Sequence, residues 1–600
     1  MKHIIKNHFA LCKLCFKTAP GFMTYWVYDG IRLRIAIFLE HTIGINLVLH
    51  SAEYHEPFRK VATYLIGITI LLAFFMLSDG FFRNRIQINA LPKLYQAVKE
   101  KMYHKAYQLD LECYDNPEYY DKFVLSVAEA EKCVDRFLSL LMVITTSITI
   151  VLTTGSFFLL NDPIGIAFSL VSFFTTFIFS KRLNRVNVET RTKSSTMERK
   201  RNYVQRVSYL NDYAKELRLN PQVTDVLTEE FDKANEEIEE LQKSVSVKRC
   251  IFGFLKNYIA SDFIVNGLYI IYLVFQAAVL HNIAYSTAVV LFTSVNFFKD
   301  GLRGLSDILP KASENSMYID KIYEFLQYEP KIVSKQGKVL PTTPQTIQLK
   351  DVCFAYNKKD GNILNHVNLT IKPGEKVALV GYNGAGKTTL IKLIMRLYDP
   401  TSGQILYGDK DIREYDVKEY RDKIGTVFQD FNMYGASLCE NVVLDDLNQT
   451  KVNYEKITDA LTRSGFKERL SRLPDKLETP ITTEFDKNGV NLSGGESQKV
   501  AIARVFYRDN EIMLMDEPSS ALDPIAEYGL NKAMQEAAKN KAVVYISHRL
   551  STTRDADNIY MLEHGQIIEE GTHDELLMKK GKYEQMWNVQ AGRYKSKKEA

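Results

Sequence analysis

The chain has 600 residues, of which 46% are hydrophobic and 25% charged, and it is too long for one hydrophobic core, so we expect at least two domains. Its 76 basic and 72 acidic residues nearly balance, which argues against nucleic acid as a partner, because phosphate-backbone binding needs a concentrated basic face. The mean hydropathy of -0.17 averages over two unlike halves. Long apolar runs lie almost entirely within residues 1–325, and the glycine-rich motifs lie within residues 346–600.

The N-terminal half carries apolar runs of the length that crosses a bilayer as a helix, about 20 residues. The clearest of them, residues 137–160, contains no charged side chain. We predict six membrane spans, near residues 20–50, 59–80, 137–160, 163–181, 257–280 and 282–305.

The first predicted span differs from the others because it contains ionisable side chains at Asp29, Arg32, Arg34, Glu40 and His41. Such groups are costly at membrane depth and usually face protein or a water-filled cavity. Arg32, Arg34 and the pair Glu40 and His41 are therefore candidates for lining a substrate pathway. The alternative is an Asp29–Arg32 pair at i, i+3 near the cytoplasmic interface, with Arg34 extending toward water. The sequence leaves both interpretations open.

The distribution of basic residues predicts the orientation in the membrane. Residues 181–201 are rich in Lys and Arg and directly follow an apolar run. Three short segments between predicted spans contain neither Lys nor Arg: residues 51–57, 161–162 and 281–282. Because positive charge concentrates on the cytoplasmic side, we expect both termini and the C-terminal domain in the cytoplasm, in an integral protein of the bacterial plasma membrane.

Two polar stretches, residues 82–135 and 181–249, are predicted to be helices that extend beyond the membrane, with turn signals within residues 109–123 and 211–220. A polar segment with two prolines follows the last helical pattern. We therefore predict a transmembrane domain at residues 1–328, a linker at 329–346 and a nucleotide-binding domain at 347–595.

The string GYNGAGKTT, residues 381–389, follows an apolar strand and opens a helix. Its glycines allow backbone N–H groups to surround phosphates, and the helix N-terminus adds its dipole. Lys387 can reach the β- and γ-phosphates, and the Thr388 hydroxyl can ligate Mg²⁺. The motif predicts ATP and Mg²⁺ as cofactors.

Two further motifs supply catalytic chemistry. In EIMLMDEPSS an apolar strand ends in two carboxylates: Asp516 can hold the metal through water, and Glu517 can polarise the attacking water. His548, in VVYISHRL, follows another predicted strand. In NLSGGE, Ser493 is predicted to be the N-cap of a helix, where its hydroxyl and the free N–H groups suit an anion.

Together these motifs resemble those of the ATP-binding-cassette exporters, in particular a half-transporter with six spans fused to one cassette. The resemblance implies an α-helical membrane domain plus an α/β P-loop NTPase domain, and an ATPase coupled to transport. The nucleotide contacts that it implies are Tyr356, Gly381, Asn383, Gly384, Gly386, Lys387, Thr388, Thr389, Ser493, Gly494, Gly495 and Asp523. It also implies catalytic roles for Glu517, His548, Gln429 and Lys387, and Mg²⁺ ligation by Thr388, Gln429 and Asp516.

The sequence departs from the family pattern at two places. Glu496 stands where Gln is common, which leaves the Ser-Gly-Gly chemistry intact. The segment TTEFDKNG, residues 482–489, has Phe485, Asp486 and Lys487 in place of a central Gly-Glu-Arg. We expect its contacts with the cytoplasmic loops to differ accordingly.

The resemblance implies a second half-transporter as partner, in a homodimer or a heterodimer, and coupling through loop tips near residues 112–119 and 212–219, docked beside Gln429. Export of a peptide or hydrophobic small molecule is the predicted function, with a lipid or multidrug flippase in a heterodimer as the alternative. An ATP-gated channel or sensor is more remote. The long uncharged runs argue against a soluble cassette regulator, and the fused membrane half argues against an importer.

Overall fold

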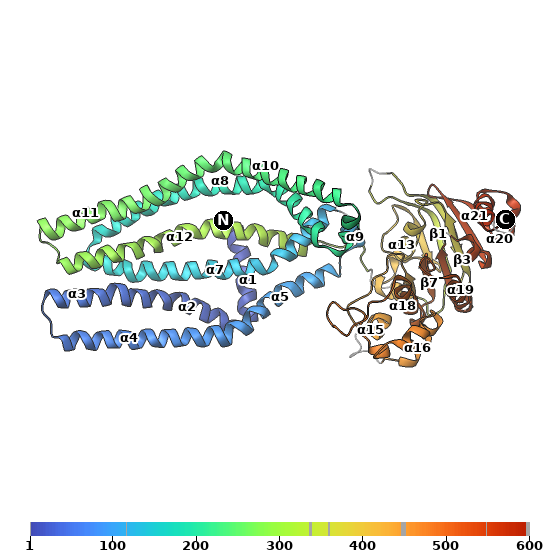
Figure 1. Cartoon of the computed structure of the whole chain (residues 1–600), viewed down its shortest axis with the longest axis horizontal. Helices are drawn as coiled ribbons and strands as arrows, with labels where there is room; N and C mark the ends of the chain where they lie inside the picture. Colours follow the sequence, from blue (N-terminus) through green and yellow to red (C-terminus); the bar gives the residue numbers. More distant parts are fainter. Residues whose placement is uncertain are drawn as a thin grey trace. The chain divides into compact units, whose positions relative to one another are not determined.

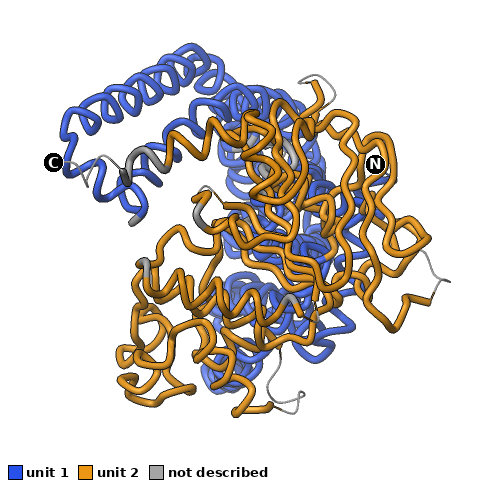
Figure 2. Tube along the Cα trace, turned by 90° about the vertical axis from the view of Figure 1, so that its right-hand side faces the viewer, with its two compact units in different colours: residues 1–107, 118–328 blue, residues 108–117, 329–600 orange. Residues whose placement is uncertain are grey.

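The structure is a computed structural model that describes residues 2–115, 117–334, 339–357, 361–445, 452–539, 541–547 and 549–595. The chain divides into two compact units, coloured separately in Figure 2. The helical unit consists of residues Met1–Tyr107 and Glu118–Tyr328, and the sheet unit of Gln108–Pro117 and Glu329–Ala600. The short segment 108–117 thus belongs to the sheet unit although the helical unit flanks it in sequence.

The helical unit is built from long helices joined by short breaks (Figure 1). Its elements are α1 Lys2–Thr18, α2 Pro20–Phe38, the π-helix η1 Leu39–Gly44, α3 Ile45–Glu53, α4 Phe58–Phe81, the π-helix η2 Phe82–Gln87, α5 Ile88–Ala106, α7 Pro117–Asn161, α8 Pro163–Tyr209, α9 Asn211–Leu219, α10 Pro221–Phe254, the π-helix η3 Leu255–Leu268, α11 Tyr269–Val274, the π-helix η4 Phe275–Val279 and α12 Tyr285–Leu326. Helix α8 contacts α10, η3 and α12 along its length.

Proline and capping residues begin several of these helices. Pro20, Pro163 and Pro221 each occupy the first helical turn, where the missing N–H costs nothing and the fixed φ favours a helix. Asp162 caps α8 by accepting a hydrogen bond from Ile164 N at 3.2 Å. The turn signals near residues 109–123 and 211–220 are confirmed, since the chain breaks there around the short helices α6, Leu111–Asp115, and α9.

Five helical stretches of the described chain are long and apolar enough to cross a membrane: Pro20–Glu53, Phe58–Ala106, Glu129–Asn161, Pro163–Tyr209 and Pro221–Val279. The first carries the ionisable residues discussed above. The predicted span at 282–305 lies in α12, which is not among the five, and its buried face includes Ser286 and Ser294 as well as Val290 and Phe298. The count of six spans stays a prediction.

The ionisable residues of the first predicted span separate into groups. Arg32 forms the expected i, i+3 ion pair with Asp29, and both side chains are buried. The pair does not exclude a cavity, because Asp29 and Arg34 both line one in the helical unit. Glu40 and His41 do not line that cavity: Glu40 is exposed, and the His41 ring lies 5.4 Å from that of Phe297.

The sheet unit contains two sheets with different architectures. The antiparallel sheet has the strand order β2-β1-β4-β5, from β1 Ile347–Phe354, β2 Leu364–Ile371, β4 Ser402–Tyr407 and β5 Lys410–Asp411. The second sheet has the order β10-β9-β3-β8-β7-β6, from β3 Lys376–Gly381, β6 Ile424–Val427, β7 Ile512–Asp516, β8 Ala542–Ile546, β9 Asn558–Glu563 and β10 Gln566–Gly571. Its pairings are parallel except for β9 with β10.

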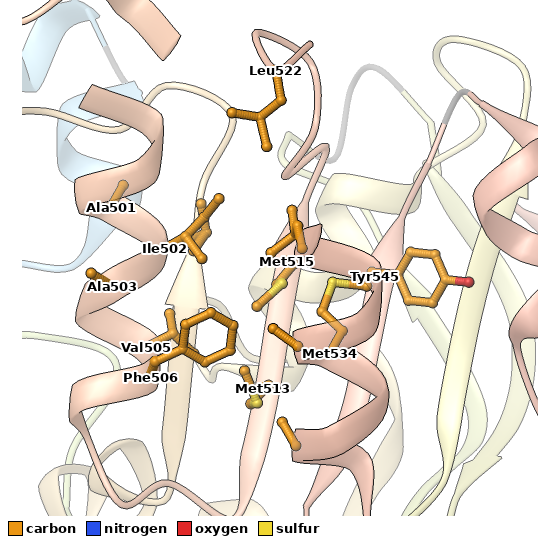
Figure 3. Close-up of a cluster of buried hydrophobic side chains, with 14 of the residues drawn as sticks. Ala501, Ile502, Ala503, Val505, Phe506, Met513, Met515, Leu522, Met534 and Tyr545 are labelled. Carbon is orange, nitrogen blue, oxygen red and sulfur yellow. The ribbon is translucent and has the colours of Figure 1, made fainter. Parts of the chain in front are cut away.

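Helices complete the unit. They are α13 Lys387–Ile394, α14 Val417–Asp422, α15 Leu438–Val443, α16 Tyr454–Arg463, α17 Lys467–Arg472, α18 Gly494–Tyr507, α19 Pro524–Ala538, α20 His573–Lys579 and α21 Lys582–Lys595, with 3-10 turns at Ile412–Glu414, Lys476–Glu478 and Leu550–Asp555. Figure 3 shows the core between α18, β7 and α19, where Phe506, Met513 and Met534 lie together. Strand β7 is buried throughout, as expected of a central parallel strand.

The strand order determines where the motifs meet. Strands β3 and β7 both pair in parallel with β8, so their carboxyl ends lie at the same edge of the sheet. The glycine-rich loop follows β3, and the two carboxylates end β7. In parallel α/β sheets, ligands bind at this edge.

The segment predicted as a linker, residues 329–346, is part of the sheet unit. The Ser334 hydroxyl accepts a hydrogen bond from Val417 N at 2.9 Å, and Leu340 is buried in the core. The described part of this segment is therefore attached to the sheet unit. The domain boundaries themselves stay predictions.

Candidate nucleotide-binding site

The glycine-rich loop between β3 and α13 has the backbone geometry that a phosphate cradle requires. Gly381 has φ +148° and Gly386 has φ +100°, a region that other residues rarely adopt. A Cβ on Gly381 would lie 2.2 Å from the Leu562 carbonyl oxygen, and one on Gly386 would lie 2.6 Å from the Leu364 side chain. Asn383 and Gly384 are exposed between them. The loop therefore holds its backbone open to a ligand.

Lys387, the first residue of α13, is buried with its ammonium group turned back over the loop. Its Nζ donates hydrogen bonds to the carbonyl oxygens of Gly381 at 2.8 Å and Tyr382 at 2.9 Å. Burial lowers the pKa of Lys387, and the nearby charges of Glu517 and Asp516 counteract that decrease. These contacts hold the Lys387 ammonium group beside the loop. A bound phosphate group could replace the two carbonyl oxygens as its hydrogen-bond acceptors.

The carboxylates at the end of β7 meet the start of α13. The Thr388 hydroxyl donates to Asp516 Oδ2 at 2.8 Å, so two oxygen ligands suited to a hard cation lie side by side. Glu517 Oε2 accepts from Gln429 Nε2 at 3.4 Å. The structure thus brings together Thr388, Asp516, Glu517 and Gln429, which the sequence placed in separate motifs.

Tyr356 lies beside the loop in an aromatic cluster. Its hydroxyl is 3.3 Å from that of Thr389, and its ring meets those of Phe354 and Tyr398 edge to face at 4.9 and 5.1 Å. The Lys392 ammonium lies 5.6 Å from the centre of the Tyr356 ring. Because the ring remains partly exposed, it can offer a face to an adenine.

The motif NLSGGE opens α18, and the prediction of an N-cap at Ser493 is confirmed. Glu496 N donates to Ser493 Oγ at 3.4 Å, while Ser493 N donates to Glu496 Oε2 at 2.8 Å, which together form a capping box. Burial by itself would raise the pKa of Glu496, but hydrogen bonds from Ser493 and the charge of Arg469 keep it below its usual value. Glu496, at a position where the family commonly has Gln, therefore supports the N-cap.

Ser493 and Gly494 are exposed. In the described part of the chain, no hydrogen bond joins Ser493, Gly494 or Gly495 to the phosphate loop that follows β3. Within one polypeptide, the two anion-binding motifs are separate.

Gln498, which is not among the predicted site residues, connects α18 to the residues that follow β7. Its buried amide donates to the Glu517 carbonyl oxygen at 3.2 Å and to Ser520 Oγ at 3.2 Å, and it accepts from Ala521 N at 3.0 Å. Glu517 has φ +49°, a strained value for a residue with a side chain. Gln498 therefore holds the backbone of the predicted base. Only its place one turn beyond Ser493 hinted at a role.

The two remaining predicted residues do not add contacts to the loop. Asp523 caps α19, with Oδ1 accepting from Ile525 N at 3.0 Å and Ala526 N at 2.9 Å. The hydrogen bond from Ala526 N is the main cause that lowers its pKa. His548 lies outside the described residues.

The segment 108–117 docks on this unit beside the aromatic cluster. The Tyr398 phenol donates to Asp115, and the Lys331 ammonium donates to Glu112 at 2.7 Å. Asp110 accepts from Lys331 N at 2.6 Å. None of these hydrogen bonds involves Gln429, beside which the loop tip was predicted to dock. The contacts with Tyr398 were not foreseen, because they join residues far apart in sequence.

The atypical segment 482–489 forms an exposed turn. Asn491 holds Thr483 through hydrogen bonds of 3.2 and 3.0 Å. The Phe485 side chain is 76% exposed, an unusual state for a large apolar group. The turn therefore presents an aromatic ring where the family pattern has Glu and Arg beside a glycine.

Known proteins resemble both the sheet unit and the chain as a whole. The ABC transporter family model matches residues 364–520. The chain is 28% identical to the subtilin transport ATP-binding protein SpaT of Bacillus subtilis over 92% of this chain and 88% of that protein. The putative multidrug export ATP-binding/permease protein YgaD of Bacillus subtilis (strain 168) is 36% identical over 45% of this chain and 46% of its own length. The ATP-dependent lipid A-core flippase of Shigella flexneri is 32% identical over 54% of each.

The chain spans about half the length of the last two relatives. Among solved structures, a bacterial Atm1-family ABC exporter with ATP bound has a TM-score of 0.76 at 20% identity, covering 94% of this chain and 97% of that one, which shows a common fold. The ABC transporter match, the relatives along most of the chain and the shared exporter fold together support a half-transporter in which a helical transmembrane domain and an ATP-binding domain share one polypeptide.

Proposed function

We propose that two copies of this architecture form a dimer that exports a substrate from the cytoplasm by alternating access, with two ATP molecules held at the interface between their sheet units. One observation carries the proposal: the N-terminus of α18 is exposed, capped and separate from the phosphate loop of its own chain. A helix N-terminus with free N–H groups suits a phosphate. A nucleotide bound to the phosphate loop of a second chain would supply that phosphate.

The residues at the loop divide the chemistry of hydrolysis among them. Lys387 would exchange its carbonyl contacts for the β- and γ-phosphates, and Tyr356 would stack on adenine. Thr388 and Asp516 would hold Mg²⁺, with Gln429 at its edge, and the bound metal would neutralise the charge that develops on the phosphates. Glu517 would accept a proton from the attacking water, and His548 would stabilise the γ-phosphate. Asp523 would contribute from the interface.

Hydrolysis would reach the membrane domain through the segment 108–117. This segment is attached at Lys331 and at Tyr398, and Tyr398 in turn touches the ring assigned to adenine. Closure of the interface would therefore displace α6 together with the sheet unit. We propose a similar role for the tip at α9, which joins α8 to α10.

The names of the relatives support export but not one cargo, since they include subtilin transport, multidrug export and a lipid flippase. We propose a peptide or a hydrophobic small molecule as substrate. The partner is a second copy of the chain, with a heterodimer as the alternative. The proposed location is the bacterial plasma membrane, with both termini in the cytoplasm.

A complementation experiment tests the shared site. Lys387→Ala should disable the phosphate loop, and Ser493→Ala should disable the opposite face. Each variant alone should lack ATPase activity in liposomes. When the two variants are co-assembled, one of the two interface sites contains both intact residues, so activity should return in part. A co-assembly of two Lys387→Ala/Ser493→Ala chains should stay inactive. Failure of the first mixture to recover would contradict a site built from two chains.

The assignment of the base is tested separately. Glu517→Gln should reduce turnover by about 10²- to 10⁴-fold, the usual contribution of general base catalysis, while ATP binding persists. Retained ATP should co-elute with the dimer at one nucleotide per chain. Glu536→Gln, on an exposed part of α19, is the matched control and should behave like the parent. Normal ATPase activity in Glu517→Gln would reject the assignment.

A further inference from the structure

A cavity of about 560 Å³ lies within the helical unit, bounded by α2, the junction of α4 and η2, and α7. Its volume falls within the range of small-molecule sites. All of its lining residues belong to the helical unit. It lies at the end of α4 where Asp79 and Arg83 follow the apolar run of that helix. A ligand there would be held at one end of the predicted membrane spans.

Most of the charge around the cavity is neutralised internally. Arg32 pairs with Asp29 and lies 3.3 Å from Asp79, and its Nη1 also donates to the Phe75 carbonyl oxygen at 2.6 Å. Arg83 donates to Asp79 at 3.0 Å. Two guanidinium groups thus balance two carboxylates in one network, which has no charge left for a ligand.

Two further lining residues, Arg34 and Asp135, are not part of this network. In the described part of the chain, neither forms an ion pair. The Nε of Arg34 is buried and has no hydrogen-bond partner among the described residues, which is costly for a charged donor. Asp135 accepts one hydrogen bond, from the Tyr95 phenol at 2.5 Å, and its own side chain is exposed. The cavity therefore offers one cation and one anion, each lacking a counterion.

Much of the remaining wall is apolar, although Gln87, Ser139 and Thr146 also line the cavity. The Trp26 indole donates to the Leu138 carbonyl oxygen at 2.9 Å, which fixes the ring against α7. Met142 and Val143 continue the same wall. An aromatic and aliphatic surface with few convergent polar groups is typical of a ligand site.

We propose that this cavity binds a zwitterionic amphiphile, with its anionic group on Arg34, its ammonium group on Asp135 and its apolar body against Trp26. A purely anionic or purely cationic ligand would leave one of the two charges unmatched. A short apolar peptide with free termini has this chemistry, and so does a single-chain lipid with a zwitterionic headgroup. Binding in the cavity does not depend on the proposed function. Only the identification of this ligand as the exported substrate rests on it.

The chain itself provides the reporter for a test. It contains two tryptophans, Trp26 and Trp587. In a Trp587→Phe background, the emission of Trp26 reports binding directly. The full-length protein in a nonionic detergent, without nucleotide, is titrated with four probes of one chain length: lysophosphatidylethanolamine, an alkyl phosphate, an alkylamine and an uncharged alkyl glycoside. A leucine tripeptide with free termini and its acetylated, amidated form make up the peptide arm.

The zwitterions should change the Trp26 emission saturably, with a Kd at least about tenfold below that of the single-charge probes, because two charge-assisted contacts replace one. Arg34→Gln should weaken the binding of the zwitterions and the alkyl phosphate but not that of the alkylamine. Asp135→Asn should weaken the binding of the zwitterions and the alkylamine but not that of the alkyl phosphate. Arg34→Lys should retain most of the binding, which separates loss of charge from misfolding. Arg59→Gln, at the opposite end of α4, is the matched control.

Equal binding of the uncharged probe, or unchanged zwitterion binding in Arg34→Gln, would overturn the inference. Saturable binding of the lipid but not the tripeptide, or the reverse, identifies the source of the ligand. Because the measurement needs neither ATP nor the catalytic residues, its outcome is independent of the Lys387→Ala and Ser493→Ala complementation. A bound zwitterion that is never transported would contradict its role as substrate while leaving the site intact.

Discussion

Replacing Gln498 by Leu should slow ATP hydrolysis although the side chain touches none of the residues assigned to the nucleotide. Leu has nearly the volume of Gln and suits a buried position. The substitution removes the hydrogen bonds to the Glu517 carbonyl oxygen, Ser520 Oγ and Ala521 N. The strained backbone of Glu517 would then retain two bonds: its N–H donates to the Ile546 carbonyl oxygen at 3.2 Å, and its carbonyl oxygen accepts from Ser520 N at 3.2 Å.

The expected magnitude follows from these three hydrogen bonds. Each contributes about 0.5 to 1.5 kcal/mol net, and Ser520 is exposed, so that water can replace its lost partner. Counting the other two bonds, the total loss is about 1 to 3 kcal/mol. If this loss falls on the transition state for hydrolysis, kcat decreases about 5- to 160-fold. The KM for ATP should change little, because Lys387 and Tyr356 keep their surroundings.

The assay is steady-state ATPase activity of the reconstituted protein, with kcat and KM determined separately and thermal unfolding measured in parallel. Gln404→Leu, on an exposed position of β4, makes the same chemical change away from the site and is the control. Unchanged kcat in Gln498→Leu, or a rise in KM that accounts for the whole effect, would refute the view that Gln498 positions the base.

Three more outcomes are expected. Gly386→Ala places a Cβ where φ is +100°, so we expect at least about tenfold weaker ATP binding in a nucleotide-binding titration, since left-handed backbone costs about 1–2 kcal/mol per residue. Tyr398→Phe removes the hydrogen bond to Asp115 and should lower the amount of substrate transported per ATP hydrolysed, with basal ATPase activity within about twofold; unchanged coupling would argue against this contact. Burial lowers the pKa of His573 below 6.5, so its neutral form stabilises the fold above that pH, and stability should decrease as pH falls below 6.5. The emission of Trp587, whose ring lies 4.4 Å from that of His573, reports the loss, and His573→Phe should flatten the pH profile.

Local patterns in the sequence predicted much of this protein. Glycines before Lys387 indicated a phosphate cradle, because only glycine adopts the required φ values at low cost. Ser493 and Glu496 indicated an N-cap, because the capping box depends on residues three apart. Long uncharged runs indicated membrane helices, and this inference is local too. A helix forms its backbone hydrogen bonds within one segment, so the length and composition of that segment suffice to predict it.

Contacts between residues far apart in sequence were beyond such reasoning. Tyr398 and Asp115 are 283 residues apart, and nothing in either neighbourhood indicates that they meet. The same holds for Arg32 and Asp79. Arg32 also pairs with Asp29, so the first predicted span contains an ion pair while Asp29 and Arg34 line a cavity.

The sequence by itself therefore predicted the chemistry of the candidate nucleotide site and determined the apolar character of the first half, because those properties depend on residue type and short-range spacing. The tertiary structure alone decided which charges neutralise each other, which side chains hold the backbone of Glu517, and that Arg34 and Asp135 have no ion-pair partner among the described residues. Those outcomes depend on how distant helices and strands pack, and close packing is a property of the whole fold.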